Sequence, residues 1–185
     1  MKSRSTWILL AIVAVLTVWL WSGYNSLVTA KAGVEGAWAK VETQYQRRID
    51  LVPNLVSTVK GAAAFEQSTF TAITEARSQW QGAGTRDAKV AAASGFDSAL
   101  SRLLVTVEAY PQLQATQAFR DLMTQLEGTE NRIATARRDY NTAVQGYNVL
   151  VKRFPKNILA GMFGFTPEAM FASDDGADKA PAVQF

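Results

Sequence analysis

The side chains that could perform chemistry in this sequence are carboxylates and guanidinium groups, because the chain contains neither Cys nor His. The absence of Cys excludes disulfides, thiol nucleophiles and Cys-ligated metals. The absence of His removes the commonest general base near neutral pH and the commonest transition-metal ligand. Glu66 and Glu130 could form a carboxylate metal site in a helical bundle, but such sites use a Glu-x-x-His spacing. We expect no metal, no cofactor and no catalytic activity.

Five charged residues fall within otherwise apolar helical stripes, where they would face the interior of a bundle. An unpaired buried charge costs several kcal/mol even after relaxation, so these side chains must be paired or close to solvent. We expect an ion network that fixes the register of the helices, formed by Lys31, Glu66, Arg77, Glu130 and Arg137.

Lys31 and Glu66 are the most specific pair in this network. They lie at nearly equal distances along the chain before and after the first expected turn. In an antiparallel hairpin the two side chains would therefore lie at the same height, within salt-bridge range.

Apolar residues recur along the body at alternating spacings of three and four, which is typical of helices packed in a bundle. The stripes run from Tyr24 to Arg48, from Ile49 to Trp80, from Ala93 to Tyr110 and from Phe119 to Phe154. No segment shows the alternating pattern, bounded by turn residues, that predicts a strand. The sequence predicts an all-α fold, in which an N-terminal transmembrane helix continues into an antiparallel up-and-down bundle of about four helices.

The first turn of the bundle is expected between the first two stripes. Asp50 can cap the second helix, and Pro53 fits its first turn, where a missing N–H costs little. Arginine pairs suit phosphate and carboxylate, although charge at a helix C-terminus is the simpler reason for the arginines here. The turn would be the membrane-distal tip of the molecule, and the predicted partner-contact residues there are Arg47, Arg48, Asp50, Pro53 and Asn54.

The fourth helical stretch is much longer than the third. Residues 112–154 would overshoot residues 86–108 in a simple hairpin. Either the helix breaks at Glu127-Gly128-Thr129, with Thr129 as a new cap, or the overhang packs against another subunit.

The N-terminus predicts a membrane anchor. Residues 1–5 form a basic tail, and Trp7 to Trp21 contains no charged residue. Residues 6–28 are long enough to cross the hydrocarbon core, and aromatic residues cluster at both ends as interfacial anchors. A cleaved signal peptide is the alternative, with Val28-Thr29-Ala30 as a weak cleavage site. The basic tail favours a single-pass protein of the bacterial inner membrane, with its body in the periplasm.

Two segments follow the last stripe. Residues 158–165 are apolar and could close the end of the bundle as a lid, or contact the membrane surface or a partner. The composition of residues 172–185 predicts a disordered tail. The formal net charge of +3 is spread along the chain without a concentrated basic face, so we expect no nucleic-acid binding.

Several motifs resemble the LemA family over about residues 20–167, and the bundle domain is placed at residues 24–167. The most specific is Arg47-Arg48-x-Asp50-Leu51-Val52-Pro53-Asn54-Leu55-Val56, and others are Arg137-Arg138-Asp139-Tyr140-Asn141, Tyr147-Asn148 and Phe163-Gly164-Phe165. The resemblance implies a bacterial membrane-anchored helical bundle without established catalysis, often encoded near a membrane metalloprotease of the HtpX type. Many members carry Tyr-Ala-x-His-Glu where this chain has Ala62-Ala63-Ala64-Phe65-Glu66, so any role of that His is absent here.

The expected function is a membrane-anchored scaffold or adaptor that presents a surface to other membrane or periplasmic proteins. An oligomeric pore-like or membrane-remodelling assembly is the alternative, which includes a homo-oligomer. A hydrolase ranks lower, because no nucleophile elbow, phosphate-binding loop or acid–base dyad is present in the sequence.

Overall fold

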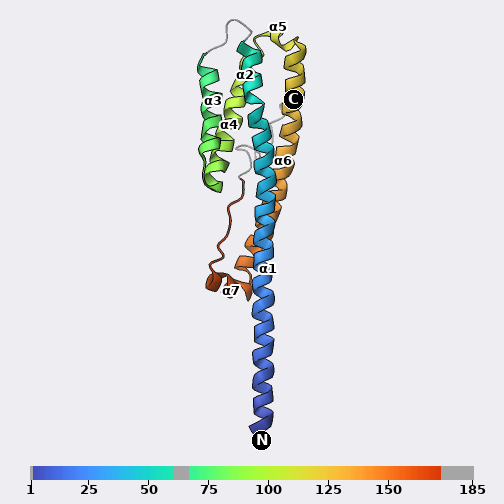
Figure 1. The fold of residues 1–185 in the computed structure, drawn as a ribbon, viewed down its shortest axis with the longest axis vertical. Coiled ribbons are helices and arrows are strands. Elements are labelled where there is room, and N and C mark those ends of the chain that lie inside the picture. Colours follow the sequence, from blue (N-terminus) through green and yellow to red (C-terminus); the bar gives the residue numbers. More distant parts are fainter. Residues whose placement is uncertain (1, 61–66, 172–185) are drawn as a thin grey trace, which may run out of the picture. The chain divides into compact units, whose positions relative to one another are not determined.

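The computed structural model describes residues 2–60 and 67–171, and every regular element in these two ranges is a helix (Figure 1). The all-α prediction is therefore confirmed. Two compact units share the chain: residues 1–36 with 139–185, and residues 37–138. Helices α1 and α6 contribute residues to both, and each unit is described by itself. Glu66 and the tail at residues 172–185 lie outside the described residues.

The first unit begins with α1 (Lys2–Asp50). The large apolar side chains from Trp7 to Trp21 are exposed, with Trp21 at 69%, whereas Leu27 and Val34 further along the helix are fully buried. Length and composition make the N-terminal part of this helix capable of crossing a membrane. An exposed apolar run that leads directly into a packed helix agrees with the predicted continuation of the anchor into the body.

The rest of the first unit consists of the second half of α6 (Gln117–Lys152), the short helix α7 (Lys156–Phe163) and an extended segment. Helix α7 ends at Gly164, whose φ of 73° is left-handed. Such a residue lets both Gly164 and Phe165 donate their N–H groups to the Ala160 carbonyl, which is the usual way to end a helix with glycine. The chain then turns into the extended segment.

The second unit is an antiparallel bundle of helices (Figure 1). After α1 come α2 (Val52–Lys60), α3 (Gln67–Gly82), α4 (Arg86–Val107), α5 (Pro111–Gln114) and the first half of α6. Thr85 caps α4 by accepting a hydrogen bond from the Ala88 N–H at 3.2 Å. Phe96, Leu100 and Leu103 of α4 are buried as the stripe predicted. Helix α4 is also long and apolar enough to cross a membrane, but its apolar face forms the core.

The turn predicted near Pro53 is wrong. Helix α2 follows α1 in the same direction, with a local irregularity at Leu51 (Figure 1). Leu51 donates its N–H to the Arg48 carbonyl and accepts from the Leu55 N–H. Proline removes only one intrahelical hydrogen bond, and the neighbouring bonds carry the helix past it. Pro53 and Asn54 therefore lie within a helical rod and not at a tip.

Helix α6 is unbroken from Gln117 to Lys152, so of the two alternatives that the sequence left open, the break at Gly128 does not occur. Thr129 is buried and donates its hydroxyl back to the Leu126 carbonyl at 2.7 Å, which is compatible with a continuing helix. The far part of α6 is covered within the first unit, where Tyr140, Val144 and Tyr147 are almost fully buried. Phe154, predicted to belong to the buried stripe, is 74% exposed.

Candidate functional site

A cluster of charges joins three helices of the second unit. Asp97 of α4 lies at its centre, with its two oxygens 3.1 Å from Arg48 Nη1 and 2.7 Å from Arg137 Nη2. The Tyr45 hydroxyl donates to Asp97 at 3.0 Å and accepts from Arg137. Glu130 pairs with Arg48. Two guanidinium groups and two carboxylates balance in charge, so this cluster has the chemistry of a structural network that fixes helix register.

The residues of the predicted ion network do not form one cluster in the structure. Glu130 and Arg137 lie in the Asp97 cluster, whereas Arg77 is half-buried on α3 and does not belong to it. Lys31, in the first unit, pairs with Glu168. The expected partner of Lys31, Glu66, lies outside the described residues. Asp97 itself was not predicted, because it lies beside the apolar stripe of α4 and not on it.

The Lys31–Glu168 pair lies close to Tyr147. The Lys31 ammonium lies 5.5 Å from the centre of this ring. Burial raises the pKa of the Tyr147 hydroxyl above its ordinary value of 10.0, and of the two charges Lys31 opposes the rise while Glu168 adds to it. Neutral Tyr147 donates a hydrogen bond to the Thr166 carbonyl at 3.0 Å. This contact belongs to a larger arrangement along α6.

Two Tyr-Asn pairs on α6 hold an extended segment, which we call the strap (residues 166–171). Asn148 donates to the Glu168 carbonyl and accepts from the Glu168 N–H, both at 2.8 Å. Asn141 does the same with Phe171 at 3.1 and 2.9 Å. Each side-chain amide thereby replaces the backbone of a neighbouring β-strand, which also offers one donor and one acceptor to a residue.

The tyrosines of the two pairs follow the same repeat. Tyr147 donates to the Thr166 carbonyl and Tyr140 to the Ala169 carbonyl, at 3.0 and 2.9 Å. Seven residues of helix rise about 10.5 Å, and three residues of extended chain cover about 10 Å. The heptad spacing of the Tyr-Asn pairs therefore matches the three-residue spacing of their acceptors on the strap.

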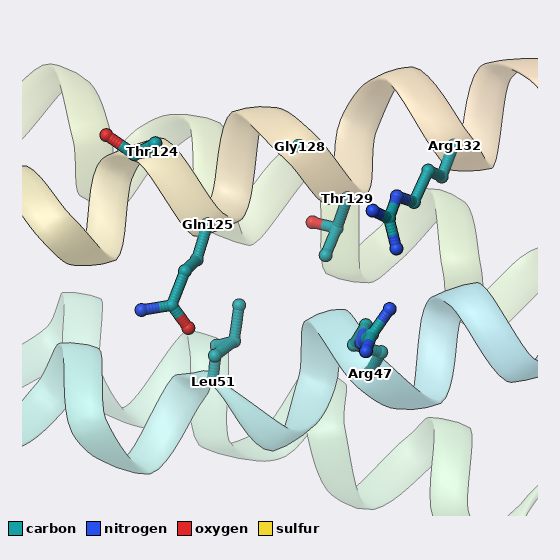
Figure 2. A pocket seen from close by; sticks show the side chains of 7 residues that line it. All are labelled: Arg47, Leu51, Thr124, Gln125, Gly128, Thr129 and Arg132. Atoms are coloured by element: carbon teal, nitrogen blue, oxygen red, sulfur yellow. The ribbon is translucent and has the colours of Figure 1, made fainter.

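The second candidate site is a pocket of about 320 Å³ in the second unit, between the C-terminal end of α1 and α6. Figure 2 shows Arg47 and Arg132 extending toward each other across it, while Thr124 points away. Leu51, Gln125, Gly128 and Thr129 complete the lining. Among the residues that the structure describes, no acidic one lines the pocket, so two positive charges face each other without a counter-charge from this lining.

Two nearby carboxylates are engaged elsewhere. Glu130 pairs with Arg48, and Asp50 accepts a hydrogen bond from Gln46 at 2.8 Å. One turn away from Arg132 on α6 the residues are the neutral Gly128, Thr129, Thr135 and Ala136. The pocket therefore offers two guanidinium groups and the Gln125 amide to an oxyanion.

Of the predicted contact residues, Arg47 lines this pocket and Arg48 lies in the Asp97 cluster. Asp50 and Arg47 also line a second hollow on α1, which shares Arg47 and Leu51 with this pocket. Arg132 was not predicted, because a single exposed arginine on a helix gives no signal until its facing residue is known. The strap was missed as well, although the repeat of Tyr-Asn after seven residues was visible in the sequence.

Comparison with known proteins identifies relatives. The LemA family matches residues 37–185. The chain is 31% identical over 181 residues to magnetosome protein MamQ 2 of Paramagnetospirillum magneticum, which covers 84% of this chain and 66% of that protein. It is 29% identical over 195 residues to magnetosome protein MamQ of Magnetospirillum gryphiswaldense, covering 91% and 71%.

Protein LemA of Metamycoplasma hominis is 23% identical over 152 residues, covering 82% of this chain and 69% of that protein. The chain thus spans about two thirds of the length of these relatives, and slightly less for MamQ 2. The exposed apolar part of α1 and the magnetosome relatives together support a membrane-associated protein. Since the family match extends over most of the sequence and includes both Tyr-Asn pairs, this chain belongs to the LemA family.

Proposed function

We propose that this protein is a single-pass, membrane-anchored scaffold without catalytic activity, which presents a surface to other membrane or periplasmic proteins. One observation carries the proposal: α1 is exposed and apolar from Trp7 to Trp21 and is then buried in a packed body within the same helix. An exposed apolar run of this length is costly in water and stable in a bilayer. The aromatic residues at its two ends suit the membrane interfaces.

We further propose that the pocket between Arg47 and Arg132 is the contact surface, and that it takes an acidic side chain of the partner. Phosphate sites usually add backbone N–H groups from a helix N-terminus or a nest. Here α6 passes the pocket as a continuous helix, and Leu51 donates its N–H to the Arg48 carbonyl, so these N–H groups are bonded within the helices. A planar carboxylate needs only guanidinium forks, and Leu51 offers an apolar contact to the methylene groups of a glutamate.

Cross-linking in native membranes tests the contact surface. Because the chain has no Cys, a single Gln125→Cys variant carries a cross-linker at the pocket and nowhere else. A Ser101→Cys variant, on the exposed face of α4, is the matched control. We expect Gln125→Cys to give a reproducible adduct, identified by mass spectrometry, that Ser101→Cys does not give. The adduct should disappear when Arg132→Gln is added.

Several outcomes discriminate among functions. The same adducts from both positions, or none from either, would reject the pocket as a contact surface. Adducts only between copies of this chain would favour the pore-like or membrane-remodelling assembly. An HtpX-type membrane protease is the first partner to look for, because the family resemblance implies it.

We propose that the body lies outside the cytoplasm, at the bacterial inner membrane. The basic residues Lys2 and Arg4 before the apolar run favour a cytoplasmic N-terminus. Protease added to sealed inner-membrane vesicles of known orientation tests this placement. Protection in inside-out vesicles and digestion in right-side-out vesicles are expected, and the opposite pattern would reverse the orientation.

A further inference from the structure

Helix α7 presents an apolar face that the body leaves uncovered. Ile158 and Met162 lie one turn apart on it and are 50% and 68% exposed. Phe163 at its end and Phe154 just before it are also exposed. Scattered apolar residues are normal on a surface, but a group of large ones on one short element marks an interaction site.

The opposite face of α7 docks on α1. Leu159 is fully buried and fills the space that a Cβ on Gly23 would need. The Phe163 ring meets the Tyr24 ring edge-on, with their centres 4.8 Å apart. Lys156 Nζ donates to the Ser26 hydroxyl at 2.7 Å. The position of α7 on α1 is thus fixed by three residues that lie along one side of the short helix.

This docking position follows directly after the exposed apolar run of α1. Trp21 is its last residue, and Gly23, Tyr24 and Ser26 are the residues that α7 contacts. At 1.5 Å per residue, these contacts lie about 3–8 Å along the helix axis from Trp21. The anchor proposed at residues 6–28 contains these contact residues in its last two turns, so α7 lies at the end of the anchor, near the level of the lipid headgroups.

We propose that α7 is a second membrane contact, which lies in the interface with Ile158 and Met162 inserted among the lipids. This inference rests on the proposed anchoring by α1, and continuity with that apolar run is what selects a bilayer over a second copy of the chain. Lys152 and Arg153, exposed at the end of α6 next to α7, add attraction to anionic headgroups.

Site-directed fluorescence in vesicles tests the proposal. The full-length chain carries an environment-sensitive label at Ile158→Cys or Met162→Cys and is reconstituted in vesicles of zwitterionic and anionic lipid. We expect blue-shifted emission and strong quenching by shallow, lipid-attached quenchers, since interfacial helices insert about 5–10 Å. Val105→Cys, which replaces an apolar residue that is 66% exposed on α4, should stay in water.

A label at Leu16→Cys, within the apolar run of α1, separates this inference from the proposed function. Deep quenching at residue 16 with water-exposed labels at 158 and 162 would overturn the inference and leave the anchor intact. A water-exposed label at residue 16 would reject the anchor itself. Blue-shifted but unquenched labels at 158 and 162, dependent on protein concentration, would show that a second copy covers α7.

Discussion

At the scale of single residues, Asp97 determines how the second unit is held together. Each of its oxygens receives a guanidinium group from a different helix, and the Tyr45 hydroxyl adds a third donor. Arg48 is only 8% exposed, so its charge depends on Asp97 and Glu130 for compensation. Removing the central charge leaves two partly buried cations facing each other.

We therefore expect Asp97→Asn to destabilise the protein by about 2 kcal/mol, the usual scale for hydrogen bonds to charged groups. Chemical denaturation followed by circular dichroism measures the change. Asp121→Asn is the control, because Asp121 is exposed and receives a hydrogen bond only from Gln117 within its own helix. Equal effects of the two substitutions would show that the cluster does not stabilise the fold.

Tyr147 makes the stability of the folded protein depend on pH in the alkaline range. Its pKa is raised in the folded protein, so the folded state keeps the proton where the unfolded state has released it. The stabilisation that neutral Tyr147 gives the folded state is therefore fully present below pH 10.0. It is lost as pH rises through the pKa of Tyr147 in the folded protein. We expect the melting temperature to fall less steeply above pH 10 in Tyr147→Phe than in the wild type. Parallel curves would contradict this assignment.

At the scale of elements, α6 both contributes to the core and binds the strap, through residues that repeat every seven positions. Its apolar positions form buried stripes, and its Tyr-Asn pairs bind the strap. The strap makes its hydrogen bonds with side chains of a helix, which removes the need for a partner strand. This explains how an extended segment is held in a protein whose described regular elements are all helices.

Each asparagine should protect its own residue of the strap. We expect Asn148→Ala to increase hydrogen exchange at the Glu168 amide and Asn141→Ala to increase it at the Phe171 amide. Loss of one hydrogen-bond pair is worth about 1–3 kcal/mol of local stability, which exchange measured by NMR detects. If both variants release the whole strap together, the two Tyr-Asn pairs do not act separately.

The two glycines at Gly128 and Gly164 should respond to alanine in opposite ways. Gly128 lies inside α6, and a Cβ there meets nothing within 4 Å, so Gly128→Ala should stabilise by about 0.5–1 kcal/mol. Gly164 has a left-handed φ of 73°, so Gly164→Ala should destabilise by about 1–2 kcal/mol. Thermal melts of the two variants measure both signs. Destabilisation by Gly128→Ala would mean that α6 is not regular there.

The sequence predicted the helical class and most of the core, because spacings of three and four identify buried helix faces directly. It failed at the turn before Pro53: this proline does lie in the first turn of α2, but α2 continues in the direction of α1 past the irregularity at Leu51. The signal against a turn was present, since Tyr45, Ile49, Val52, Leu55 and Val59 are all buried in one uninterrupted phase. Contacts between distant segments, such as Lys31 with Glu168 or Arg47 facing Arg132, depend on helix heights that spacing alone does not supply.

At the scale of the whole molecule, an exposed apolar segment and two packed units share one chain. The side chains from Trp7 to Trp21 are exposed, whereas each unit has its own buried residues. Membrane attachment and folding of the body are therefore separable properties. This separation can be measured.

Deleting residues 2–21 should release the body from membranes without unfolding it. We expect the truncated protein to be extracted by alkaline carbonate while the full-length protein stays with the membrane fraction. Its helical circular dichroism and melting temperature should match those of the full-length protein in detergent, because the large apolar side chains from Trp7 to Trp21 are exposed. A large loss of melting temperature would show that the apolar run supports the fold.

Because seven helical residues match three extended residues in length, α6 fixes the length of the strap. An insertion or deletion of one residue between Glu168 and Phe171 would leave one asparagine facing the wrong peptide group, whatever amino acid is involved. Only a change of three strap residues, combined with a whole heptad of α6, would keep the alignment. The length of this short segment is therefore set by the pitch of a helix, while its composition at exposed positions is free to vary.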